Sequence, residues 1–123
     1  QPPLVNPTRT KNWFLDYILI FPNFHLLPFE GTYITHHMWP VSATRSHWEA
    51  RIYLPQAKNA SQLFAREHSR IQAREVWLED GSTMEFQQQG LDSGAWKYLL
   101  LQDQEILIRH ANKVCEDYSK RVL

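Results

Sequence analysis

The chain has 123 residues and 13 basic and 13 acidic side chains, so its formal net charge is zero. This length is typical of one domain. The chain also lacks the excess of basic residues that is typical of a nucleic-acid-binding protein. The longest apolar run is too short to cross a bilayer, and a single cysteine excludes an internal disulfide. We therefore expect a cytoplasmic protein that binds neither nucleic acid nor membrane.

Residues 1 to 14 carry three prolines and no signal-peptide core, which predicts an extended arm or the cut end of a longer chain. From residue 15 to about residue 54 the pattern has the two-residue period of β-strands. In 33–39, Ile34, His36 and Met38 alternate with residues of the opposite face. The segment 47–54 alternates in the same way. We expect an antiparallel sheet.

After Pro55 the pattern changes to that of a helix, predicted near residues 60 to 79, with Asn59 or Ser61 as its N-cap. Gly81 is expected to break or bend this helix, and Ser82 with Glu85 has the spacing of a capping box for a further turn or two. A second, amphipathic helix is predicted near residues 103 to 121. Its apolar stripe includes Cys115, interpreted as a core residue. Strands followed by helices predict an α+β fold class.

The six histidines do not show the spacing of a helical metal site, because no two are four residues apart. His36 and His37 are adjacent, so on a strand they face opposite sides of the sheet. A site built from His37 and a distant partner stays possible on this pattern. The simpler interpretation is that these are sheet histidines that are hydrogen-bonded or exposed.

Asp80 admits two interpretations. It lies near the predicted helix end, and Ala73, Val76 and Trp77 are expected to share its helical face. A carboxylate beside such an apolar stripe would face a cavity and could bind a cation. Alternatively, "EDGS" is a solvated helix stop with Gly81 as the residue after the C-cap.

Three segments of the chain resemble a known family. "YILIFPNF" at 17–24, "VWLEDGSTMEFQQQGLDSG" at 76–94 and "DQEILIRHANKVCEDY" at 103–118 are similar to the C-terminal part of the catalytic domain of Rieske-type aromatic ring-hydroxylating oxygenase α subunits. They occur in the family's order, and the resemblance extends over nearly the whole chain from about Asp16 onward. The resemblance implies a helix-grip fold (Bet v 1-like or START-like), an antiparallel sheet with a long C-terminal helix, of which this chain would be only a part.

The resemblance also implies a mononuclear non-haem Fe(II) site held by two histidines and one aspartate, which activates O₂ to hydroxylate an apolar or aromatic substrate. Such a set of ligands leaves positions open for O₂ and substrate. Asp80 takes the place of the aspartate, as metal ligand and catalytic residue. Ala73, Val76 and Trp77 are implied to line the substrate pocket.

The chain departs from the family pattern in two places. The family's paired histidines, H-x₄₋₅-H, have no counterpart here. A [2Fe–2S] Rieske cluster needs two cysteines and two histidines, and the chain has one cysteine. The chain is therefore expected to supply one iron ligand, with residues 15–123 forming the C-terminal portion of the catalytic domain and any Rieske cluster lying in an absent N-terminal region.

The partners implied for the complete enzyme are the substrate, O₂, an electron-transfer ferredoxin or reductase, and further subunits in a homo- or hetero-oligomer. A second function stays open. The chain could be a helix-grip module that binds a hydrophobic ligand without redox chemistry, which its aromatic content of 13% would equally suit.

Overall fold

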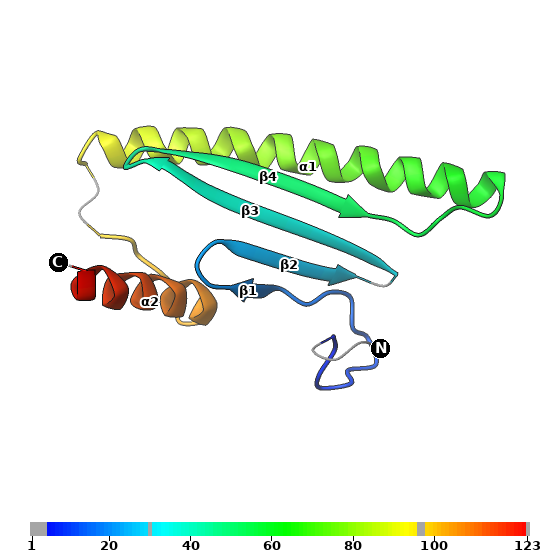
Figure 1. Ribbon diagram of the computed structural model, residues 1–123, viewed down its shortest axis with the longest axis horizontal. Helices are drawn as coiled ribbons and strands as arrows, with labels where there is room; N and C mark the ends of the chain where they lie inside the picture. The colour runs from blue at the N-terminus through cyan, green and yellow to red at the C-terminus, as the bar shows by residue number, and fades with distance from the viewer. Residues whose placement is uncertain (1–4, 30, 96–97, 123) are drawn as a thin grey trace. The chain divides into compact units, whose positions relative to one another are not determined.

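The computed structural model describes residues 5–29, 31–95 and 98–122, and the chain divides into two compact units, Gln1–Gln88 and Gln89–Leu123. The first unit contains the sheet and most of the first helix, and the second contains the end of that helix and the last helix. In chain order the elements are β1 (Ile18–Ile20), β2 (Phe24–Phe29), β3 (Thr32–Ser42), β4 (Arg45–Tyr53), α1 (Ala60–Asp92) and α2 (Ile106–Val122) (Figure 1). This arrangement confirms the predicted α+β class and fits a helix-grip-like fold.

The four strands form one antiparallel sheet in the order β1-β2-β3-β4, so each strand pairs with its neighbour in sequence. Short turns make this possible. Gly31, between β2 and β3, has a φ of 73°, a left-handed conformation that glycine adopts without a steric cost. Only residues 43 and 44 separate β3 from β4. The registers of these hairpins determine which side chains meet across the sheet.

One face of the sheet, called the inner face here, meets α1 at β3 and β4. On β3 it carries Ile34 and His36, each only 8% exposed. Their register partners on β4 are Ile52 and Ala50. The ring of Trp77 on α1 lies 5.7 Å from the ring of His36, which shows that this face meets the helix. The predicted alternation of β3 and β4 is thus confirmed.

Helix α1 begins where it was predicted but does not end there. The side-chain oxygen of Asn59 accepts a hydrogen bond from the Gln62 amide at 2.9 Å, so Asn59 is the N-cap. The helix then continues through Gly81 to Asp92, and the expected end near residue 79 is wrong. Ser82 does not cap a new helix, because its hydroxyl donates to the carbonyl oxygen of Glu79 at 2.7 Å. One glycine costs a helix about 1 kcal/mol relative to alanine, which strong helix formers on both sides can offset.

In the second unit, α2 agrees with the predicted helix to within the expected error of about three residues. Its polar side carries ion pairs such as Lys113 with Asp117, whose charged atoms lie 2.8 Å apart. Cys115 is exposed in this unit, so its interpretation as a core residue is wrong. Within the described residues, no helix combines the length and the apolar character needed to span a membrane.

Candidate functional site

Asp80 lies in the interior of α1, twelve positions before the helix ends at Asp92. The interpretation of "EDGS" as a helix stop is therefore wrong. Its side chain is exposed, and within the described part of the chain no hydrogen bond or ion pair engages its carboxylate. The carboxylate is therefore open to solvent.

The three residues expected to share the face of Asp80 are divided between two sides of α1. Ala73 and Trp77 are half-buried, as is Gly81 one turn further on, and these three form a stripe at spacings of four. Trp77 and Gly81 of this stripe lie against the inner face. Val76 is 51% exposed and lies one turn before Asp80 on the solvent side of the stripe. Asp80 thus lies at the border between the covered stripe and solvent.

Below this part of α1, two histidines face each other across the sheet. His25 on β2 is the register partner of His36 on β3, so both side chains belong to the inner face. The Tyr17 hydroxyl forms a hydrogen bond with Nδ1 of His25. The indole N–H of Trp48 donates to Nδ1 of His36 at 2.9 Å. The inner face therefore carries two hydrogen-bonded pairs of side chains, and His36 of the second pair contacts α1 through Trp77.

Burial changes the acid–base properties of these side chains. Desolvation lowers the pKa of His25 below its usual value of 6.5. Desolvation also lowers the pKa of His36, with a further lowering from the charge of His25 and an opposing effect from the negative charge of Asp80. The pKa of Tyr17 is raised by desolvation. Burial thus favours the neutral form of both imidazoles.

A neutral imidazole is a metal ligand only through a nitrogen that carries a lone pair. Because Nδ1 of His36 accepts the Trp48 N–H, its proton lies on Nε2, so neither ring nitrogen is free to bind a metal. His37 is no better placed, since its ring lies on the outer face, 4.6 Å from that of Phe24. Among the described residues, no group of three His, Cys, Asp or Glu side chains could hold a metal ion.

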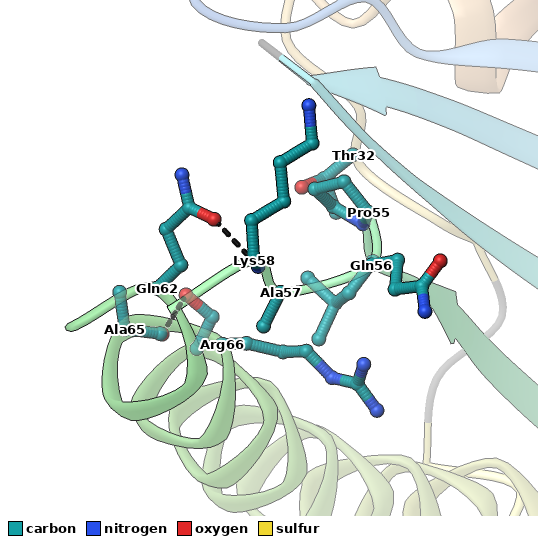
Figure 2. A pocket seen from close by; sticks show the side chains of 10 residues that line it. Thr32, Pro55, Gln56, Ala57, Lys58, Gln62, Ala65 and Arg66 are labelled. Atoms are coloured by element: carbon teal, nitrogen blue, oxygen red, sulfur yellow. Dashed lines mark hydrogen bonds between the residues drawn. The ribbon is translucent and has the colours of Figure 1, made fainter. Parts of the chain in front are cut away.

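A cavity of about 370 Å³ lies at the other end of α1, between the β4–α1 connection and the first turns of the helix (Figure 2). Ser69, the last of its lining residues, is about 16 Å along the helix from Asp80. Its charged lining residues are Lys58 and Arg66, and Figure 2 shows their side chains extending in different directions. The cavity thus contains neither Asp80 nor the paired histidines of the sheet, and its two charges do not converge on a common point.

Sequence reasoning singled out Asp80 and Trp77, and it did not single out His25, His36 and Trp48, whose side chains the structure brings together by hydrogen bonds and strand pairing on the sheet. The alternation of β3 had already put His36 on the face opposite His37. The missing information was the hairpin register, which puts His25 directly across from His36. A short β2–β3 turn was the only sequence signal that could have suggested this pairing.

Comparison with known proteins gives one match. A family model described as ring hydroxylating alpha subunit (catalytic domain) matches residues 1–120 of this chain. No curated protein and no solved structure matches it.

Proposed function

The chain belongs to the family of ring-hydroxylating alpha subunits, in their catalytic domain, and from this premise we propose that it supplies Asp80 as the carboxylate ligand of a mononuclear Fe(II) site. Iron bound there would activate O₂ to hydroxylate an apolar or aromatic substrate. The observation that supports this role is the carboxylate itself, which is exposed and uncommitted beside the sheet-facing stripe of α1.

The donor groups of this chain fit one ligand of such a site but not the whole site. Two imidazoles and one carboxylate are the usual set for Fe(II) oxygenases, and the described residues bring no such group together. The sequence also contains no H-x₄₋₅-H pair. The proposal therefore requires that both imidazoles come from polypeptide outside this chain.

The role of this chain's other residues follows from their position. Trp77 and Ala73 are half-buried, one and two turns before Asp80 respectively, and Val76 is exposed one turn before it. Apolar side chains there would hold an apolar substrate and exclude water around the reacting atoms. Electrons would reach the iron from outside these residues, because a single cysteine cannot hold a Rieske cluster. In the complete enzyme a ferredoxin or reductase would supply them.

A second candidate function is the binding of a hydrophobic ligand without redox chemistry. The half-buried apolar side chains of Ala73 and Trp77 on the sheet-facing side of α1 suit this function equally. The two functions differ in one respect that can be measured, the dependence of iron content on Asp80.

The test is Asp80→Ala in the complete α subunit, with Glu79→Ala as the matched control. Both side chains are exposed carboxylates on α1, so each substitution should change the free energy of unfolding by less than about 0.5 kcal/mol. Asp80→Ala should lose mononuclear iron and product formation, and Glu79→Ala should keep both. Retention of iron and oxygenation by Asp80→Ala would show that Asp80 is not a ligand.

A further inference from the structure

Two residues of α1, Trp77 and Gly81, lie before and after Asp80 and face two neighbouring side chains of the sheet, His36 and Trp48. Trp77 and Gly81 are one helical turn apart, so they lie on one face of α1. The Trp77 ring meets the His36 ring edge-on, with centroids 5.7 Å apart. A methyl group at Gly81 would lie 3.6 Å from a ring carbon of Trp48, so this turn of the helix backbone is close to the indole.

The side chains of His36 and Trp48 contact each other on the sheet. Their rings lie 5.4 Å apart and are inclined by only 27°, and they are joined by the 2.9 Å hydrogen bond from Trp48 Nε1 to His36 Nδ1. An indole N–H can only donate, so this bond holds the neutral imidazole in the form with its proton on Nε2. His36 is 8% exposed, which leaves its ring little freedom to turn.

We propose that the His36–Trp48 pair positions the turn of α1 that carries Asp80. His36 contacts Trp77 before Asp80, the Trp48 ring lies beside the backbone at Gly81 after it, and the hydrogen bond between His36 and Trp48 fixes these two positions relative to each other. The pair would also affect how firmly iron is held, and this consequence rests on the proposed function of Asp80 as an iron ligand. His36 and Trp48 are positioning residues, and they touch neither metal nor substrate.

The outer face of the sheet offers a matched control pair. His37 and Trp39 also have stacked rings, 5.5 Å apart and inclined by 29°. They lie on the face of β3 opposite to His36. Trp39→Phe thus removes an indole N–H from the sheet, as Trp48→Phe does. It leaves the contact between His36 and Trp77 and the position of Trp48 beside Gly81 unchanged.

The first experiment compares Trp48→Phe with Trp39→Phe in the full chain. Amide hydrogen exchange of residues 77–84 should become about five- to tenfold faster in Trp48→Phe, since one hydrogen bond and its contact are lost, and should stay unchanged in Trp39→Phe. Nitrogen chemical shifts of the His36 ring should show the proton on Nε2 in the wild type and both tautomers in Trp48→Phe. Equal exchange in both variants, or a wild-type His36 with its proton on Nδ1, would overturn the proposal.

The second experiment keeps Trp48 and changes its acceptor. His36→Gln retains an oxygen that can accept the indole N–H, whereas His36→Leu has a similar volume and no acceptor. Slow exchange of residues 77–84 should be kept in His36→Gln and lost in His36→Leu. The same exchange rate in both variants would contradict the role of the hydrogen bond, even if Trp48→Phe failed to fold.

Iron content of the complete α subunit separates this inference from the proposed function. Trp48→Phe should lose iron faster on dialysis than Trp39→Phe. If Asp80→Ala keeps its iron, the proposed function fails, and the exchange and tautomer results still decide whether the pair positions the helix. If Asp80→Ala loses iron and Trp48→Phe changes neither exchange nor iron retention, only the positioning role fails.

Discussion

Gly81→Ala should stabilise the protein, because Gly81 lies in the interior of α1. A glycine at such a position is about 0.8–1.0 kcal/mol less favourable than alanine. The added methyl group would lie 3.6 Å from a ring carbon of Trp48, an ordinary van der Waals contact without a steric cost. The free energy of unfolding should therefore rise by about 1 kcal/mol, which corresponds to an increase in Tm of about 4 °C for a chain of this length.

The assay is urea and thermal unfolding followed by far-UV circular dichroism, with Gly94→Ala as the control. Gly94 follows the end of α1 and has a φ of 68°, a conformation that costs alanine about 1 kcal/mol or more. Gly94→Ala should therefore lower stability. If Gly81 ended the helix in the same conformation, its alanine variant would be destabilised as well. A loss of stability in Gly81→Ala would refute the continuous helix.

Three further predictions follow from the site. Stability should fall as the pH is lowered through and below the usual histidine pKa of 6.5, because burial lowers the folded-state pKa of His25 and His36 and the unfolded chain then binds more protons. Unfolding by urea at several pH values measures this dependence. His36→Gln should make the free energy of unfolding depend less steeply on pH. Anaerobic calorimetry of the chain alone with Fe(II) should detect no tight stoichiometric site, since the described residues form no three-ligand group. Val76→Phe in the complete α subunit should change which substrates are oxidised but not the iron content, because Val76 lies one turn before Asp80; an unchanged range of products would count against Val76 as a pocket residue.

Local patterns in the sequence determined much of the fold. The period of two in β3 and β4 assigns each side chain to a face, because successive side chains of a strand point to opposite sides. The change of period after Pro55 marks the start of α1, and Asn59 supplies the cap that short polar side chains typically provide. The resemblance to ring-hydroxylating α subunits is also a property of the sequence, and the family match confirms it.

Only the tertiary structure decided where α1 ends and what surrounds Asp80. The cost of Gly81 is about 1 kcal/mol, so neighbouring residues and packing against the inner face determine whether the helix continues, and neither is visible in a four-residue motif. The pairing of His25 with His36 depends on the β2–β3 register, and a shift of one residue would have turned either side chain to the other face. The bond from Trp48 to His36 joins residues 12 positions apart. Such contacts arise from strand pairing and helix packing, which is why sequence patterns located Asp80 but not the pair of side chains below it.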